Sequence, residues 1–352
     1  MNAVLRLNLD IDPKETTSSL RIKRAAESIK DLSPRFNRIV ILSHRGRPNG
    51  IEKKLGLAPI VNELALKLRR RITFLEGHPE QYPKILFDKK GIFVLENTRF
   101  LPEENQNNDT LAGLYASFGD IFINDDFATS HRAQASNVGI TKFLTAIDGP
   151  IMKLELAALQ KVMHEPNRPL TLIVGGSKMS SKLPVIQNFI TQADYILLGG
   201  GVGNTALKAA GYDVMDSICE ESLVPTAEQL IIHKNIFYPT DFRVEKNTIL
   251  DIGPHTASSF AEIIASSKTI IWAGPMGMFE RKSFARGTTV IAQAIASTKS
   301  FSLAGGGETT SAIIELGLEK KFSFLSTGGG AMLELLAGEQ LPALEALRIK
   351  YK

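Results

Sequence analysis

The segment RIVILSHRGRPNG, residues 38–50, contains a short apolar run that is followed at once by cationic side chains. Residues 39–42 are apolar and mostly β-branched, which favours a buried β-strand. The next five residues include three basic side chains: His44, Arg45 and Arg47. A solvated loop would account for one strand end of this kind. The same pattern at several strand ends in one half of the chain would instead predict a basic pocket.

Apolar, strand-like runs alternate with amphipathic helical patterns along the whole chain. The first half contains AVLRLNLDI, IVILSH, ITFLEG, GIFVLEN and DIFIND, and the second contains LTLIVGG, YILLGGG, NIFYPTDF, IIWAGP, FSLAGGG and FSFLSTGGG. Segments such as SSLRIKRAAESIK and SKLPVIQNFI lie between them with helical periodicity. Runs this apolar are typical of parallel strands that are covered by helices on both faces. We therefore predict an α/β protein with two doubly wound, Rossmann-like parallel-sheet domains.

The predicted division between the domains is the helical segment IMKLELAALQKVMHE, residues 151–165. The predicted parts are an N-terminal domain (1–150), a hinge helix (151–166), a C-terminal domain (167–335) and a final segment returning toward the N-terminal domain (336–352). Ligands of doubly wound sheets bind at the carboxyl ends of the strands. The side chains at those ends are therefore the candidate site.

Composition excludes several classes of protein. The 352 residues have a formal net charge of only +4 and no run of five or six basic residues, which argues against a nucleic-acid-binding protein. Cys219 is the single cysteine, which fits a reducing compartment. The chain starts without the apolar region of a signal peptide, and no apolar run approaches the ~18 residues of a membrane span. We expect a cytoplasmic protein that binds neither membranes nor nucleic acid.

Cationic side chains gather at the strand ends and adjacent helix starts of the first half. They are Arg21, His44, Arg47, Arg99, His131 and Arg132. Arginine guanidinium groups bind carboxylate and phosphate with two parallel hydrogen bonds. Each of these residues alone would be a solvated or ion-paired side chain. Together they predict a pocket for a small ligand with several negative charges.

The second half has glycine-rich strand ends instead. These are GGSKMSSK at 175–182, GGG at 199–201, GPMG at 274–277, GGGETT at 305–310 and STGGG at 326–330. Glycine allows a ligand to approach the backbone closely, and a helix N-terminus behind such a loop attracts phosphate. Lys178 and Lys182 are four residues apart at the start of a predicted helix, so both would face one anion. For these two lysines a solvated helix face is the alternative.

A small-anion pocket and a nucleotide-polyphosphate site together suit phosphoryl transfer across an interdomain cleft. Glu308 in GGGETT is the acid predicted to hold magnesium, which takes few protein ligands when phosphates supply the others. No residue stands out as a general base, and a carboxylate acceptor would need none. The chain lacks the P-loop, dinucleotide-binding, zinc-site and nucleophile-elbow motifs.

Ten motifs, in order along most of the chain, resemble those of the phosphoglycerate kinase family. They are SHRGRP, LENTRF, NDDFATSHRAQAS, GGSKMSSK, LLGGG, DIGP, WAGPMGMFE, FARGT, GGGETT and STGGGAMLELLAGEQLPALEAL. The resemblance, to a shortened and divergent member, implies a glycolytic phosphotransferase. It would convert 1,3-bisphosphoglycerate and ADP reversibly to 3-phosphoglycerate and ATP, with Mg²⁺ in a closed cleft. We expect a monomer.

The resemblance also implies roles for individual residues. The phosphoglycerate pocket would contain Asn8, Asp10, Arg21, His44, Arg47, Arg99 and Arg132. Arg21 and Lys178 would act on the transferring phosphoryl group. The nucleotide site would contain Gly176, Lys178, Lys182, Gly199, Gly200, Gly201, Glu280, Gly306, Gly307, Glu308 and Thr309. Glu308 would also serve the metal.

The chain departs from the family pattern at four places, which leaves alternatives open. Asn8 and Asp10 exchange the usual amide and carboxylate, and Ala273, Ser181 and Glu308 replace an asparagine and two aspartates. Since the phosphate-handling Lys and Arg residues remain, we expect an active enzyme. A non-catalytic, nucleotide-binding scaffold would bind both ligands without turnover. A nucleic-acid-binding protein would show steep salt dependence, and a dehydrogenase would change nicotinamide absorbance.

Overall fold

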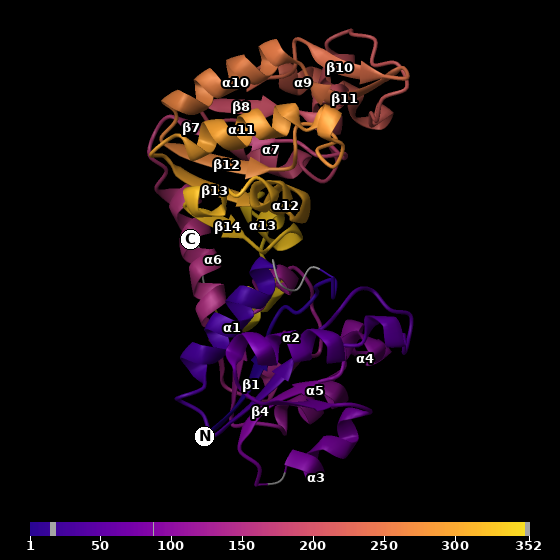
Figure 1. Cartoon of the computed structure of the whole chain (residues 1–352), viewed down its shortest axis with the longest axis vertical. Coiled ribbons are helices and arrows are strands. Elements are labelled where there is room, and N and C mark those ends of the chain that lie inside the picture. The colour runs from indigo at the N-terminus through magenta and orange to yellow at the C-terminus, as the bar shows by residue number, and fades with distance from the viewer. Residues whose placement is uncertain (15–18, 87, 349–352) are drawn as a thin grey trace. The chain divides into compact units, whose positions relative to one another are not determined.

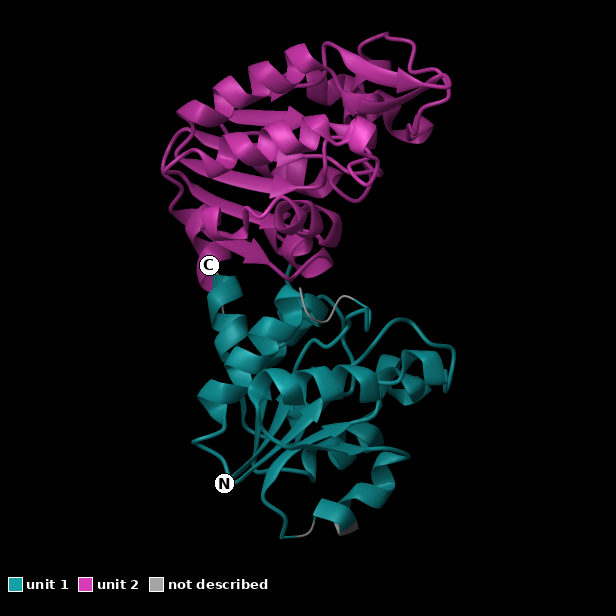
Figure 2. Cartoon of the chain, viewed as in Figure 1, with its two compact units in different colours: residues 1–156, 340–352 teal, residues 157–339 magenta. Residues whose placement is uncertain are grey.

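The computed structural model describes residues 1–14, 19–86 and 88–348, which divide into two compact units. Unit 1 contains the described residues of 1–156 and 340–352, and unit 2 contains residues 157–339 (Figure 2). Two predicted segments extend past the described residues. Ser18, in the predicted helical stretch SSLRIKRAAESIK, and residues 349–352 of the predicted final segment lie outside them.

Unit 1 is built on a six-stranded parallel sheet with the order β3-β4-β2-β1-β5-β6. Its strands are β1 (Asn2–Arg6), β2 (Arg38–Leu42), β3 (Ile72–Leu75), β4 (Gly91–Leu95), β5 (Ile121–Asn124) and β6 (Ala146–Asp148). Its helices are α1 (Leu20–Leu32), α2 (Ala58–Leu68), α3 (Tyr82–Leu86), α4 (Pro102–Asn105), α5 (Asp109–Ala116) and α14 (Pro342–Ala346). Short 3₁₀ turns are η1 (Lys53–Leu55), η2 (Pro79–Gln81), η3 (Thr98–Phe100), η4 (Phe127–Thr129) and η5 (Gly139–Lys142).

Both faces of this sheet are buried, because successive strand residues point to opposite sides. Leu5 and Ile41 pack in one apolar cluster with residues of α1 and α2. Val4 and Val40 pack in a second cluster with residues of α5. The apolar run that opened the sequence analysis is therefore strand β2, with a helical layer on each side.

Unit 2 repeats this design with the strand order β14-β13-β12-β7-β8-β9, again all parallel. Its sheet strands are β7 (Leu170–Val174), β8 (Tyr195–Leu198), β9 (Ile236–Phe237), β12 (Thr269–Ala273), β13 (Phe301–Gly305) and β14 (Phe324–Ser326). Its helices are α7 (Leu183–Phe189), α8 (Gly200–Ala209), α9 (Val224–Ile231), α10 (Pro254–Ser266), α11 (Arg286–Ala296), α12 (Gly307–Glu315) and α13 (Gly330–Leu336). Its 3₁₀ turns are η6 (Glu221–Leu223), η7 (Lys282–Phe284) and η8 (Glu319–Lys321). The predicted doubly wound α/β architecture is confirmed.

One predicted strand of unit 2 was wrong. NIFYPTDF does not form a single strand, because Pro239 cannot donate to a ladder hydrogen bond and the pairing stops at β9. The chain then forms an antiparallel hairpin of β10 (Phe242–Glu245) and β11 (Thr248–Ile252), seen at one end of unit 2 in Figure 1. The turn residues Lys246 and Asn247 both have positive φ, as a two-residue hairpin turn requires.

Helix α6 (Pro150–His164) contains the boundary between the units, which falls after Leu156. Its span is close to the helical segment predicted from the sequence. Within the described ranges of the chain, no helix has the length and apolar character needed to cross a membrane.

Candidate functional site

The central strands of unit 1 bring several predicted residues to one edge of the sheet. Strands β4, β2, β1 and β5 are consecutive neighbours, and all four run in the same direction. Their carboxyl ends therefore lie together. The residues that follow them include Asn8 and Asp10 after β1, His44 and Arg47 after β2, Arg99 after β4 and Arg132 after β5.

Asp10 connects three parts of this edge. Its carboxylate accepts a hydrogen bond from the Gly46 backbone N–H at 2.8 Å, and its Oδ2 lies 3.7 Å from Nε2 of His44. Its backbone carbonyl accepts a hydrogen bond from the guanidinium of Arg21, which lies in the first turn of α1. The extra carboxylate that the sequence introduces at Asp10 thus faces a backbone donor and an imidazole.

Arg47, Arg99 and Arg132 line one hollow of about 400 Å³, together with Asn105 and Gln134. Arg99 is held there by a 2.8 Å hydrogen bond to the carbonyl of Gly46, and its Nε is buried without a hydrogen-bond partner in the structure. Burial lowers the pKa of Arg99 to about 10, with smaller effects from Arg6 and Arg132. Arg99 is therefore still cationic at neutral pH despite its burial, as a pocket for a multiply charged anion requires.

His44 does not contribute a charge to this cluster, which corrects the prediction that it is one of the cationic groups. Its side chain is buried, and its Nδ1 lies 2.9 Å from a guanidinium nitrogen of Arg6. Burial lowers the pKa of His44 well below its usual value, and the guanidinium groups of Arg6 and Arg99 lower it further. His44 is therefore a neutral hydrogen-bonding group.

Two other residues near the strand ends have local roles. The Asn8 side chain accepts a hydrogen bond from the backbone N–H of Asp10 at 3.0 Å and so closes a turn. The guanidinium of Arg45 donates to the carbonyls of Ile11 and Lys54, at 3.0 and 2.8 Å, and holds two loops together. Of the basic residues that follow β2, only Arg47 lines the hollow.

Asp125 fixes the helices around this site. It follows β5, and its buried carboxylate accepts hydrogen bonds from the hydroxyl of Ser28 in α1 and from the backbone N–H of Met152 in the first turn of α6. Burial raises the pKa of Asp125 to about 6, and these hydrogen bonds oppose that rise. Asp125 thus joins the sheet edge to α1, the helix that carries Arg21.

Replacing Asp125 with asparagine should change how stability depends on pH. The pKa of Asp125 in the folded state, about 6, is above its ordinary value of 3.8, so the folded state binds this proton more tightly. The corresponding stability is complete below about pH 4 and is lost as the pH rises through about 6. The free energy of unfolding of the wild type, relative to the Asp125→Asn variant, should therefore fall between about pH 4 and pH 7.

Denaturant unfolding of both proteins across this range measures the difference. The control is Asp31→Asn, at a surface carboxylate of α1 that is half exposed and pairs with Arg35. This variant should change the free energy of unfolding only slightly, because exposed ion pairs contribute ~0–1 kcal/mol. A constant difference for Asp125→Asn across this pH range would contradict the raised pKa.

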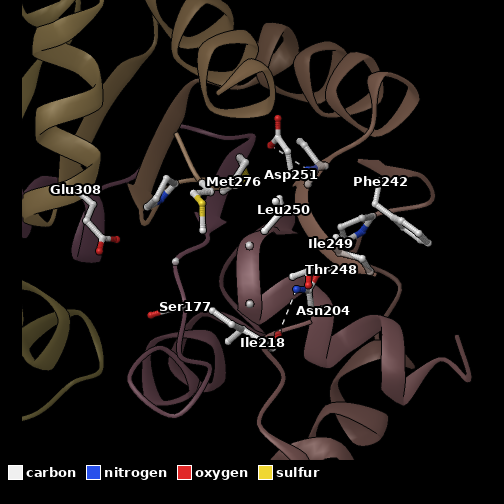
Figure 3. A pocket seen from close by; sticks show the side chains of 18 of the residues that line it. Ser177, Asn204, Ile218, Phe242, Thr248, Ile249, Leu250, Asp251, Met276 and Glu308 are labelled. Carbon is white, nitrogen blue, oxygen red and sulfur yellow. Dashed lines mark hydrogen bonds between the residues drawn. The ribbon is translucent and has the colours of Figure 1, made fainter. Parts of the chain in front are cut away.

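Unit 2 contains a pocket of about 170 Å³ that is lined by some of the predicted nucleotide residues. Five of them line it: Gly176, Gly200, Gly201, Glu280 and Glu308. Figure 3 shows Glu308 on one side of the pocket and Phe242 on the other. Six further predicted residues are not among its lining residues: Lys178, Lys182, Gly199, Gly306, Gly307 and Thr309. The buried hydroxyl of Thr309 accepts a hydrogen bond from the backbone N–H of Gly274, so it braces the end of β12.

Glycine at positions 200 and 201 is required by the backbone itself. Gly200 has φ +57°, and a Cβ there would lie 2.8 Å from the carbonyl oxygen of Gly176. A Cβ on Gly201 would lie 2.3 Å from the carbonyl oxygen of Ser177. The start of α8 therefore lies directly on the loop after β7, and this close packing forms one wall of the pocket.

Lys178 and Lys182 do not share a helix face, which corrects the sequence prediction. Helix α7 begins only at Leu183, because Pro184 has no N–H and occupies its first turn. Lys178 lies in the preceding loop, where the N–H and hydroxyl of Ser180 each donate to the Glu220 carboxylate at 2.7 Å. Burial lowers the pKa of Lys182, and the nearby Glu308 carboxylate opposes that effect.

Glu308 is suited to a metal that takes few ligands from the protein. It is exposed in the first turn of α12, and it lines the pocket. Its carboxylate is near enough to Lys182 to raise the pKa of that lysine against the lowering effect of burial. Among the residues that the structure describes, no three His, Cys, Asp or Glu side chains form a metal-binding group. A single carboxylate beside a lysine fits Mg²⁺ that takes most of its ligands from phosphate groups.

Sequence reasoning missed the apolar wall of this pocket. Ile249, Leu250 and Phe242 come from the β10–β11 hairpin, which the sequence analysis did not predict. Alternation of side chains in FRVE, followed by Lys246-Asn247, is the signal that could have indicated a hairpin. Asn204 also lines the pocket, and its side chain donates to the carbonyl of Ile218 at 3.2 Å (Figure 3).

Comparison with known proteins identifies close relatives over the whole chain. The family model described as phosphoglycerate kinase matches residues 3–339. A curated phosphoglycerate kinase from Roseiflexus sp. (strain RS-1) is 38% identical, and the alignment covers 97% of this chain and 94% of the relative.

Two solved structures are similar to the chain in fold. The phosphoglycerate kinase from Coxiella burnetii is 34% identical with a TM-score of 0.83, and the match covers 100% of this chain and 97% of the relative. The phosphoglycerate kinase from Pyrococcus horikoshii OT3 is 31% identical with a TM-score of 0.89, and the match covers 99% and 96% of the two chains.

Proposed function

Since the chain belongs to the phosphoglycerate kinase family, it transfers a phosphoryl group between 1,3-bisphosphoglycerate and ADP to give 3-phosphoglycerate and ATP, and we propose that the two residue clusters described above carry this reaction. The observation that carries the proposal is the hollow lined by Arg47, Arg99 and Arg132. Three guanidinium groups on one hollow are suited to a ligand that has both a phosphate and a carboxylate.

Unit 1 holds the phosphoglycerate. Arg47, Arg99 and Arg132 neutralise its phosphate, and we assign neutral His44, which does not line the hollow itself, to a hydrogen bond at the same sheet edge. The guanidinium of Arg21 donates to the backbone carbonyl of Asp10, and we assign Arg21 to the transferring phosphoryl group. The carboxylate of Asp10 accepts from the backbone N–H of Gly46 and so connects the loops after β1 and β2. Asn8 supports the turn that presents Asp10.

Unit 2 holds the nucleotide. The apolar wall of Ile249, Leu250 and Phe242 suits the flat face of a purine base, and the exposed carboxylate of Glu280 accepts from the ribose hydroxyl groups. Lys182 and the N-terminus of α12 face the phosphates. Gly307 has open space around the position of a Cβ, which leaves room for a phosphate at that helix start.

The reaction needs positioning and charge neutralisation more than proton transfer. The acceptor carboxylate of 3-phosphoglycerate is already ionised at neutral pH, so no general base is required. Arg21 and Lys178 stabilise the charge on the phosphoryl group during transfer. Bound Mg²⁺, held through Glu308, would supply further neutralisation of the nucleotide phosphates.

Several finer assignments belong to the same proposal. The single cysteine supports a reducing, cytoplasmic location. The monomeric state, the hinge role of residues 151–166 and a site between the two domains stay predictions. Nucleic acid and membranes are not part of the proposed function.

A coupled assay with 3-phosphoglycerate, ATP and Mg²⁺ tests the assigned metal residue. The wild-type protein should convert 3-phosphoglycerate and ATP to products, and omission of Mg²⁺ should abolish this activity. Glu308→Asp should leave or improve activity, because it shortens the side chain and keeps the carboxylate. Glu308→Ala should lower the rate by about tenfold or more and raise the Mg²⁺ concentration needed for half-maximal activity.

The matched control is Glu315→Ala, at an exposed glutamate at the other end of α12. It should leave the Mg²⁺ dependence unchanged. Wild-type behaviour of Glu308→Ala across Mg²⁺ concentrations would remove Glu308 from the metal site. Binding of both ligands without turnover by the wild type would favour the scaffold alternative.

A further inference from the structure

Arg6, the last residue of β1, has a fully buried guanidinium group that the proposed reaction does not use. Its NH1 lies 3.0 Å from Oδ2 of Asp126, which is also fully buried, so the two charges form a pair. The same NH1 donates to the carbonyl of Leu7 at 2.7 Å. A buried charge is normally paired and hydrogen-bonded in this way, and Asp126 supplies the opposite charge for Arg6 without a contribution from His44.

A second set of contacts fixes the direction of the Arg6 guanidinium. Its Nε donates to the hydroxyl of Ser136 at 2.9 Å. That hydroxyl in turn donates to the buried carboxylate of Glu104 at 2.5 Å, so its lone pairs face Arg6. With Nε and NH1 both engaged, the remaining nitrogen, NH2, points at Nδ1 of His44 at a distance of 2.9 Å.

This contact determines which nitrogen of His44 carries the proton. Every nitrogen of a guanidinium is a donor and none is an acceptor. Nδ1 of His44 therefore accepts the hydrogen bond and has no proton, and the proton of the neutral ring is on Nε2. Nε2 lies 3.7 Å from Oδ2 of Asp10, at the edge of the sheet that carries the phosphoglycerate residues.

We propose that Arg6 is a positioning residue that holds His44 in the neutral form with the proton on Nε2, so that the single N–H donor of the ring lies on the Asp10 side, at the sheet edge that we assign to the phosphoglycerate. The use of this donor for the phosphoglycerate rests on the proposed function of unit 1, whereas the tautomer does not. The position of this donor is set by a residue 38 positions earlier in the chain.

Burial and the surrounding guanidinium groups keep the imidazole neutral as well. The groups that face His44 are Arg6, Arg21, Arg99, Arg132, Asp10 and Asp126. The two carboxylates favour a positive imidazole, but they lie beyond hydrogen-bond distance, at 3.7 and 3.9 Å. Burial, followed by the four guanidinium groups, lowers the pKa of His44 well below its usual value. The imidazole therefore stays neutral where an ordinary histidine would gain a proton.

Nitrogen-15 NMR of the intact wild-type protein tests the tautomer directly. The His44 signals are identified by their loss in a His44→Gln variant. Nδ1 should resonate as an unprotonated ring nitrogen and Nε2 as a protonated one, unchanged between about pH 5 and pH 8. A proton on Nδ1, or titration of His44 in this range, would overturn the proposal.

Arg6→Lys tests whether Arg6 is the cause. A lysine keeps the charge near Asp126 but has no planar fork with which to reach His44 as well. The KM for 3-phosphoglycerate should rise by about tenfold, the size of one lost hydrogen bond. In the same variant, the His44 nitrogen-15 signals should move toward those of a mixture of the two neutral tautomers, because Nδ1 no longer accepts from a fixed donor while burial keeps the ring neutral.

The matched control is Arg38→Met, at an arginine at the opposite end of β2 that donates to the carbonyl of Phe118 at 3.2 Å. It should leave the His44 signals and the KM for 3-phosphoglycerate unchanged. A folded Arg6→Lys protein whose His44 signals still show one tautomer with the proton on Nε2 would overturn the role of Arg6. If Arg6→Lys does not fold, the wild-type spectra alone still decide the tautomer. These spectra do not depend on turnover, so an inactive wild type would overturn the proposed function and leave this inference standing.

Discussion

Arg21→Ala should lower kcat for 3-phosphoglycerate and ATP by on the order of 10²-fold or more, the usual loss when one donor to developing charge is removed. Arg21 lies in the first turn of α1, and its guanidinium is held against the carbonyl of Asp10. We assign it to the phosphoryl group that is being transferred, and the negative charge that Arg21 would neutralise is greatest in the transition state. An interaction made only in the transition state lowers kcat when it is lost.

Arg47→Ala should give the opposite pattern. Arg47 lines the hollow with Arg99 and Arg132, and we assign it to the phosphate at the far end of the substrate. That phosphate does not react, so its contacts are equally strong in the ground state and the transition state. The KM for 3-phosphoglycerate should therefore rise while kcat and the KM for ATP stay nearly unchanged.

Steady-state kinetics with each substrate varied in turn separates these outcomes. The control is Arg35→Ala, at an exposed arginine after α1 that pairs with Asp31 on the surface. It should behave as the wild type, because exposed ion pairs contribute ~0–1 kcal/mol. If Arg21→Ala altered only KM, Arg21 would leave the list of catalytic residues.

Gly175→Ala should destabilise unit 2 severely. Gly175 follows β7, and its N–H donates to the carbonyl of Ala273 at 3.0 Å. A Cβ at this position would lie 2.1 Å from the carbonyl oxygen of Pro275 and 2.7 Å from that of Gly274. Both obstacles are backbone atoms, so no side chain can rotate away and the ends of β7 and β12 would have to separate.

We expect a loss of ~3 kcal/mol or more, at the upper end of overpacking effects, and a fall in Tm of roughly 6–12 °C for a unit of this size. Nucleotide binding should weaken as well, because Gly176 and Pro275 line the pocket. Calorimetry and circular dichroism measure the stability of the purified variant.

Gly307→Ala is the matched control for stability. Gly307 is the first residue of α12, its φ is not positive, and nothing lies within 4 Å of the Cβ position. Its Tm should stay within a degree or two of the wild type, since alanine is the better helix former. A Tm of Gly175→Ala equal to that of the wild type would contradict this prediction, because β7 and β12 would then have separated without a loss of stability.

Much of the fold could be predicted from local patterns. Residues 39–42 form β2 because a short, β-branched apolar run is stable only when both of its faces are covered. The placement of Arg47, Arg99 and Arg132 followed from the same reasoning, since the carboxyl ends of neighbouring parallel strands must share an edge. The β10–β11 hairpin could not be predicted with equal ease, because no residue of β10 is fully buried and its apolar signal is therefore weak. An apolar residue also follows soon after Pro239, at Phe242, so the end of β9 is not clearly marked in the sequence.

The chemical state of His44 depends on residues far from it in the chain. In sequence it stands beside Arg45 and Arg47 and resembles them as a basic residue at a strand end. In the structure the three side chains have different contacts. Arg45 donates to a backbone carbonyl of a neighbouring loop, and Arg47 lines the hollow. His44 is buried and contacts the guanidinium of Arg6. Burial and the partner of each ring nitrogen set the charge of an imidazole. Both are decided only when β1 pairs with β2 and places Arg6 next to Leu42, two residues before His44.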